Sequence, residues 1–117
     1  MALAGRREEP LLQVALESGA GTRALAVPTD VADPEAVRQL FDRTVQQFGR
    51  VDLLFNNAGI GAHASFAETT EAQFDQLVAI HVKAPFFLTQ KLLPLINDGG
   101  RIINISSGLA RFSLPGY

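Results

Sequence analysis

The chain has 117 residues, of which 47% are apolar, and its ten basic and twelve acidic side chains give a net charge of -2. This is the length of one globular domain, and the low net charge excludes the compositional signature of disorder. The chain has no basic excess, so we expect no nucleic-acid partner. It contains no cysteine, which excludes disulfides, cysteine-ligated metal sites and thiol catalysis.

We expect a cytoplasmic protein that does not enter a membrane. The first residues lack the basic and apolar regions of a secretory signal. The longest apolar stretch, residues 77–95, is about as long as a membrane span, but it contains His81, Lys83, Lys91 and two prolines. These residues are costly in hydrocarbon, so the stretch predicts a buried helix.

The first half of the chain alternates short apolar runs with segments of helical periodicity. Residues 1–4 and 24–27 are predicted strands, and residues 8–18 between them are a predicted helix. A second helix is predicted to begin at Asp33, an N-cap residue followed by proline, and to end at Gly49.

The second half of the chain continues the same alternation. Residues 51–55 predict a strand, and Thr70 with Gln73 predicts a capping box that begins a long helix. We expect Pro85 to bend this helix and a glycine pair to separate it from a last strand at residues 101–105. Strands that alternate with helices indicate an α/β fold with a parallel sheet.

Polar residues follow each predicted strand, where the carboxyl ends of parallel strands share one edge of the sheet. A cation, a carboxylate, amides and hydroxyls at one edge suit an extended polar ligand with a phosphate group better than a protein partner. Turn chemistry alone favours the same residue types. His63 and His81 are too isolated to predict a metal site. The strand-end residues are Gly5-Arg6, Thr29-Asp30-Val31, Asn56-Asn57-Ala58-Gly59 and Ser106-Ser107.

One apparent motif is in the wrong context. Residues 59–64 match the dinucleotide-binding pattern G-x-G-x-x-G/A. That pattern binds a pyrophosphate only where its glycines open a helix directly after a strand. Here residues 56–58 intervene, and the next predicted helix begins near Thr70. We expect the small residues to let the backbone approach a ligand.

Three segments in the same order resemble the short-chain dehydrogenase/reductase family. They are the strand end at Asp30-Val31, residues 51–59 with Asn-Asn-Ala-Gly, and residues 100–107 with a final Ser-Ser. The resemblance covers the whole chain. It implies a Rossmann-type, doubly wound parallel sheet that binds NAD(P) and transfers hydride between nicotinamide and a small carbonyl or alcohol substrate.

The resemblance also implies roles for single residues. Asp30 and Val31 would face the adenine of the cofactor, and Asn57, Ala58 and Gly59 would lie along its ribose. Ser107 matches the catalytic serine, whose hydroxyl holds the substrate oxygen and stabilises the charge that develops there.

Arg6 predicts NADP as the cofactor, with NAD the less favoured alternative. Members that prefer NAD carry an acidic residue at the end of this strand, where Gly5 stands here. The guanidinium that follows can bind a 2′-phosphate through two hydrogen bonds. An alternative interpretation is that Arg6 and Arg7 form a solvated, charged turn.

His81 is the second predicted catalytic residue. It stands where the family usually has an asparagine that helps to organise a proton relay. A histidine can form similar hydrogen bonds or titrate near neutral pH. The alternative is a ring that is only packed against the sheet.

Two hallmarks of the family are missing from the sequence. It contains neither the opening strand with its T-G-x-x-x-G-x-G turn nor a Tyr-x-x-x-Lys motif, since Tyr117 is the last residue. We therefore expect residues 1–117 to be a partial NAD(P)-binding Rossmann domain that lacks the first strand and everything after the fifth.

Such a chain is expected to be inactive alone. Without the central strand its sheet has unpaired edges, so we expect it to be unstable, to aggregate or to pair with another chain. A full-length form is expected to be a homo-oligomer. Two alternatives are a non-catalytic truncated product that associates with a full-length relative, and a phosphate-accepting regulatory domain. The second is disfavoured, because Asp30 has only Asp33 as an acidic neighbour.

Overall fold

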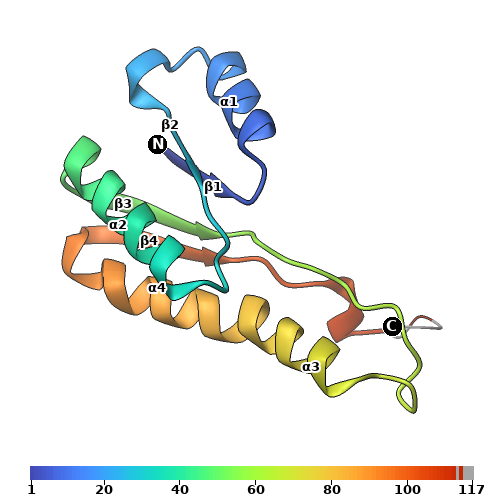
Figure 1. The fold of residues 1–117 in the computed structure, drawn as a ribbon. Coiled ribbons are helices and arrows are strands. Elements are labelled where there is room, and N and C mark those ends of the chain that lie inside the picture. Colours follow the sequence, from blue (N-terminus) through green and yellow to red (C-terminus); the bar gives the residue numbers. More distant parts are fainter. Residues whose placement is uncertain (113, 115–117) are drawn as a thin grey trace.

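A computed structural model describes residues 1–112 and 114 (Figure 1). Helices and strands alternate along the chain, and the predicted α/β pattern is confirmed. Short 3-10 turns lie at Gly21–Arg23, Leu93–Leu95 and Gly108–Ala110. The main elements are β1 (Ala2–Gly5), α1 (Glu8–Glu17), β2 (Leu25–Pro28), α2 (Pro34–Phe48), β3 (Val51–Asn56), α3 (Glu71–Val78), a π-helical segment (Ala79–Lys83), α4 (Ala84–Leu92) and β4 (Ile96–Asn104).

The strands form two separate parallel pairs instead of one sheet. β1 pairs with β2, and β3 pairs with β4. Figure 1 shows α1 and α2 on opposite sides of the strands, with α4 beside α2. Within the described part of the chain no strand joins β1 to β3. This division agrees with the expectation that the sheet is incomplete at its centre.

The hydrophobic core lies between α2, α4 and one face of β2 and β3. Leu54 of β3 points into it and is 8% exposed, whereas its neighbours Leu53 and Phe55 are each 52% exposed. This alternation follows from the two-residue period of a strand. The buried members of the core are Val27, Val37, Leu40, Leu54, Leu88 and Leu92.

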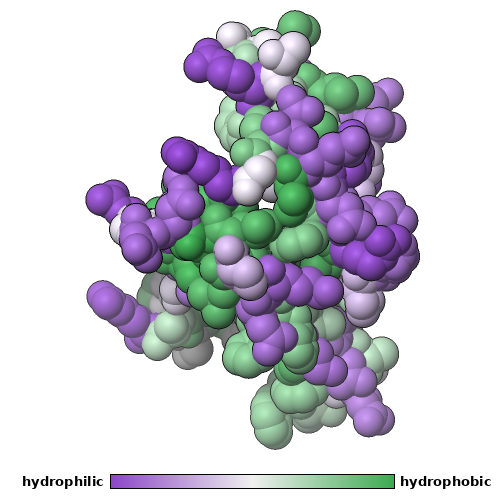
Figure 2. All heavy atoms as spheres, turned by 90° about the vertical axis from the view of Figure 1, so that its left-hand side faces the viewer, coloured by the Kyte–Doolittle hydropathy of each residue, from purple (hydrophilic) through white to green (hydrophobic). Residues whose placement is uncertain are grey.

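The chain exposes more surface than a compact protein of its mass. Its accessible surface is 8499 Å², whereas a folded monomer of this mass exposes about 6200 Å². Its radius of gyration is 16.0 Å, against about 13 Å for a compact domain of this length. Figure 2 shows apolar side chains exposed across the middle of one face, between polar ones. The core is therefore only partly covered.

Most of the predicted helix ends are confirmed, because they depend on local hydrogen bonds. The carboxylate of Asp33 accepts from the amide of Glu35, and Gly49 ends α2 with φ of 71°. Thr70 and Gln73 form both hydrogen bonds of a capping box at the start of α3.

The expected separation of the last helix from the last strand by two glycines is wrong. β4 begins at Ile96, so both glycines lie inside it, where the pairing with β3 shifts between Val51 and Leu53. Gly99 has φ of 83°, and a Cβ on Gly100 would clash with the side chain of Ile96. The glycines therefore permit an irregularity within the strand.

A π-helical segment, Ala79–Lys83, lies directly before α4, close to Pro85, where we expect the helix to bend. Pro85 lies in the first turn of α4 and has no amide hydrogen with which to bond the carbonyl of His81. The π-helical turn is consistent with this missing α-helical bond. In the described ranges, no helix combines the length and the apolar character needed to cross a membrane.

Glu35 makes the folded chain less stable at acidic pH. Its carboxylate accepts two hydrogen bonds from Arg38, at 2.6 and 2.9 Å, and these lower the pKa of Glu35 from 4.5 to about 2. The stabilisation is present above pH 4.5 and is lost as the pH falls toward 2. We expect Glu35→Gln to weaken the dependence of the melting temperature on pH in this window. The effect should be small, because the pair is exposed. Identical pH profiles for the variant and the parent chain would contradict this.

Candidate functional site

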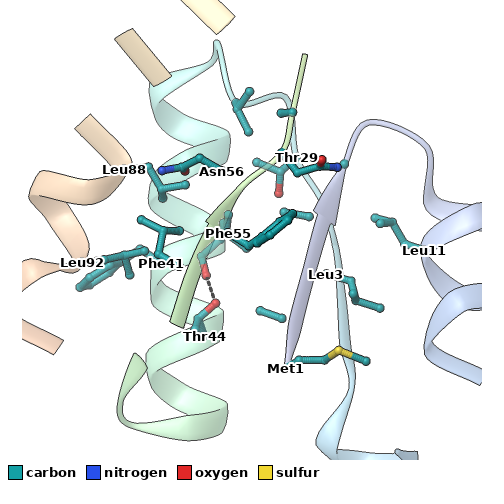
Figure 3. Close-up of a pocket in the computed structure, with 18 of the residues that line it drawn as sticks. Met1, Leu3, Leu11, Thr29, Phe41, Thr44, Phe55, Asn56, Leu88 and Leu92 are labelled. Atoms are coloured by element: carbon teal, nitrogen blue, oxygen red, sulfur yellow. Dashed lines mark hydrogen bonds between the residues drawn. The ribbon is translucent and has the colours of Figure 1, made fainter. Parts of the chain in front are cut away.

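A cavity of about 1180 Å³ lies between β1 and β3 (Figure 3). The backbones of both strands line it, together with the loops that follow β1, β2 and β3. The structure thus brings together all the residues that the sequence predicts as cofactor-binding. They are Arg6, Asp30, Val31, Asn57, Ala58 and Gly59.

Arg6 lies between the end of β1 and the start of α1. Its neighbour Arg7 occupies the N-cap position of α1 without a side-chain capping bond. The side chain of Arg6 is exposed, and it takes part in none of the ion pairs among the described residues. The guanidinium therefore remains available for an anionic ligand at this rim of the cavity.

Thr29 holds the end of β2 against the end of β1. It is 3% exposed, its amide donates to the carbonyl of Gly5 at 2.8 Å, and its hydroxyl donates to the carbonyl of Val27 at 2.9 Å. These bonds place Asp30 at the same end of the cavity as Arg6. The sequence places Thr29 at the strand end but indicates no role for it, because its only signal is a polar residue after an apolar run.

Asp30 has one carboxylate oxygen engaged within its own loop. Oδ1 accepts from the amide of Ala32 at 2.9 Å, which is a common turn interaction for aspartate. The other oxygen accepts no hydrogen bond from the described residues, which leaves it for a donor on a ligand. The side chain is exposed, as a ligand contact at the cavity rim requires.

His81 fastens the loop that follows β3 to the long helix. Its Nε2 lies 2.7 Å from the carbonyl oxygen of Ile60 and 3.2 Å from the amide of the same residue. The shorter distance favours the tautomer in which Nε2 donates to the carbonyl. A Cβ on Gly59 would lie 3.1 Å from the histidine ring, so the loop approaches the helix closely. Ile60 takes part through its backbone, which leaves no signal in the sequence.

A second link fixes the carboxyl ends of β3 and β4. The side-chain amide of Asn56 donates to the side chain of Asn104 at 2.8 Å, and the amide of Ile105 donates to the carbonyl of Asn56 at 3.1 Å. Asn57 therefore follows a strand end that is held on one side by β4.

The two predicted catalytic residues lie outside the lining of the cavity. The hydroxyl of Ser107 accepts from the amide of Leu109 at 3.2 Å and caps a 3-10 turn. Ser107 is exposed. The prediction for Tyr117 lies outside the described residues. In the part of the chain that the structure describes, no three histidine or acidic side chains are grouped as metal ligands.

Comparisons with known proteins match the chain to one protein family. The family model for short chain dehydrogenase matches residues 1–117. A short chain dehydrogenase of Passalora fulva is 34% identical over 98 residues, which are 83% of this chain and 37% of that protein. A short-chain type dehydrogenase/reductase of Picea abies is 36% identical over 104 residues, covering 86% of this chain and 38% of the relative.

Solved structures give the same result. A dehydrogenase/reductase from Sinorhizobium meliloti is 40% identical with a TM-score of 0.88, over 98% of this chain and 47% of that one. A 3-ketoacyl-(acyl-carrier-protein) reductase from Brucella melitensis, complexed with NADH, is 29% identical with a TM-score of 0.87. The match covers 98% of this chain and 50% of the reductase. The chain spans between about a third and a half of the length of these relatives.

Proposed function

Because the chain belongs to the short-chain dehydrogenase/reductase family, which its sequence resembles, we propose that it supplies half of an NADP site and a catalytic serine. The reaction is hydride transfer between NADP(H) and a small carbonyl or alcohol substrate. The observation that carries this proposal is the shared cavity that all the predicted cofactor residues line. The solved relative with bound NADH supports a dinucleotide as the ligand class.

The residues present fit the adenosine end of NADP. Arg6 would offer a cation with paired donors for the 2′-phosphate, and the second carboxylate oxygen of Asp30 would accept from the adenine amino group. Asn57, Ala58 and Gly59 line the same cavity and would lie beside the ribose. The cofactor supplies the hydride. The chain contains no glycine-rich turn for the pyrophosphate, so the proposal covers only the adenosine end of the cofactor.

Ser107 acts on the substrate rather than on the cofactor. Its hydroxyl donates to the substrate oxygen and stabilises the negative charge that develops as hydride reaches the carbonyl carbon. The contact with the amide of Leu109 uses the oxygen as an acceptor and leaves the hydroxyl hydrogen for the substrate. Proton supply needs a further acid, which this sequence does not provide in the family's Tyr-x-x-x-Lys form.

His81 positions the cofactor loop through its bond to Ile60. His81→Ala is expected to raise the KM for NADPH by about two- to tenfold, the worth of one neutral hydrogen bond. His81→Gln should retain most of the affinity, because a glutamine amide reaches about as far as Nε2. If His81 instead takes part in the proton relay predicted from the sequence, His81→Gln should lower kcat as much as His81→Ala, because glutamine does not exchange a proton as imidazole does. An equal loss of kcat in the Gln and Ala variants would contradict the positioning role.

A hybrid enzyme tests the proposed function. In the hybrid, this chain replaces the segment of the Sinorhizobium meliloti dehydrogenase/reductase to which it aligns. The alignment covers 98% of this chain. The segments on either side of the replaced one are those of the relative. We expect a folded hybrid, checked by circular dichroism, to oxidise NADPH in the presence of ketones or aldehydes. A folded hybrid that binds neither NADPH nor NADH would refute the proposal.

A further inference from the structure

The beginning of β4 is an irregular segment that lies opposite a single residue of β3. The residues of β4 that pair with β3 pass from Ile96 directly to Arg101, so residues 97–100 lie opposite Asp52 alone. The segment lies at the amino-terminal end of the strand pair, away from the loops that hold the candidate cofactor site (Figure 1). Its backbone is therefore not held by the regular pairing of the two strands.

This segment contains an aspartate followed by a glycine, Asp98 and Gly99. Asp98 is exposed, and its carboxylate has no hydrogen-bond or ion-pair partner among the described residues. Gly99 has φ of 83°, and no atom outside its chain neighbours lies within 4 Å of the place that a Cβ would take. Since glycine has no side chain to shield its own amide, the carboxyl group of Asp98 can approach that amide freely.

The other aspartates of the chain, all of them described, are each restrained. Asp42 and Asp75 lie inside helices, where the backbone amides are hydrogen-bonded. Asp33 is followed by a proline, which has no amide hydrogen. Asp30 and Asp52 have carboxylates that already accept hydrogen bonds, and each is followed by a residue with a bulky side chain. The aspartate before Gly99 is the one without such a restraint.

We propose that Asp98 is a site of spontaneous modification, at which the folded chain converts aspartate into isoaspartate. The amide nitrogen of Gly99 attacks Cγ of Asp98, and the carboxyl hydroxyl leaves with the amide proton as water, which closes a succinimide ring. Water then opens the ring. Attack at the main-chain carbonyl carbon of Asp98 leaves Gly99 joined to Cγ, which is isoaspartate, whereas attack at Cγ restores aspartate. The water that is lost is regained, so neither the mass nor any oxidation state changes.

The irregular segment also has room for the product. Isoaspartate lengthens the main chain by one carbon atom and leaves the α-carboxylate as the side group. Because residues 97–100 lie outside the regular pairing with β3, the added carbon falls where no pair of strand residues has to be broken. The modification does not depend on the cofactor or on hydride transfer, so it stands apart from the proposed function.

The test incubates the 117-residue chain in neutral buffer at physiological temperature. Proteolytic fragments are then analysed by electron-transfer dissociation, which distinguishes the two isomers although their masses are equal. We expect isoaspartate to accumulate at residue 98 ahead of every other aspartate. Asp98→Glu is the matched control, because the longer side chain does not close a five-membered ring, and its isoaspartate should stay at the background level. No isoaspartate at residue 98, or equal amounts at the other aspartates, would overturn the proposal.

A second variant separates the effect of the fold from that of the Asp-Gly sequence. Gln76→Gly places a glycine after Asp75 at an exposed position within α3. The reaction there requires the helix to open locally, so we expect about tenfold less isoaspartate at residue 75 than at residue 98 of the same chain. Circular dichroism checks that the variant retains its helices. Equal amounts at the two positions would show that the fold does not select Asp98, and would overturn the proposal.

Discussion

Replacing Ser107 with alanine is expected to lower the kcat of the hybrid enzyme by about 10²- to 10³-fold, the usual cost of losing one donor to a developing oxyanion. The KM for NADPH should change little, because Ser107 lies outside the residues that line the cavity. Steady-state kinetics with saturating NADPH measures both constants. A loss confined to KM would contradict the assignment of Ser107 to the chemical step.

Ser106→Ala is the matched control for this prediction. Ser106 is the same residue type, one position earlier and also exposed. Successive residues of an extended chain point in opposite directions, so its hydroxyl should not reach the same substrate atom. We expect the Ser106 variant to retain kcat within a few-fold of the parent hybrid. Equal losses at both positions would indicate damage to the segment rather than to one functional group.

Arg6→Glu is expected to reverse the cofactor preference of the hybrid. A hydrogen bond to a charged group contributes about 1.5–3 kcal/mol, which corresponds to roughly a 10- to 150-fold change in affinity. The kcat/KM for NADPH should fall by this factor, and that for NADH should remain or rise, since a carboxylate accepts from ribose hydroxyls. A parallel fall for both cofactors would favour the alternative of a solvated charged turn.

Arg43→Glu separates this local effect from a change in net charge. Arg43 is an exposed arginine on α2 and lies outside the cavity lining. The substitution alters the net charge by the same amount as Arg6→Glu. We expect it to leave the ratio of the two cofactors unchanged, because the interactions of distant exposed charges are largely screened by salt.

Local signals in the sequence were sufficient for most helix ends. Asp33, Gly49 and the capping box at Thr70 depend on hydrogen bonds within a few residues, and the structure contains all of them. The start of β4 did not follow from such signals. Whether Gly99 and Gly100 end an element or bend it depends on pairing with β3, which is remote in the sequence.

Some features of the candidate site could also be predicted from the sequence, and others could not. The carboxyl ends of parallel strands share an edge, so Arg6, Asp30 and Asn57 could be grouped from the order of the predicted strands. The bond from His81 to Ile60 could not be predicted, because a backbone carbonyl is present at every position and leaves no trace in the residue type. The cavity could not be predicted either, because it arises from the space between two strand pairs that are remote in the sequence.

Amide hydrogen exchange of the folded hybrid, with and without NADP⁺, shows whether this chain holds the cofactor. We expect slower exchange on cofactor binding in three short segments, residues 5–7, 29–32 and 57–60. They follow β1, β2 and β3 and line or adjoin the same cavity. Protection confined to the segments supplied by the relative, with none in these three, would show that the cofactor is held without this chain.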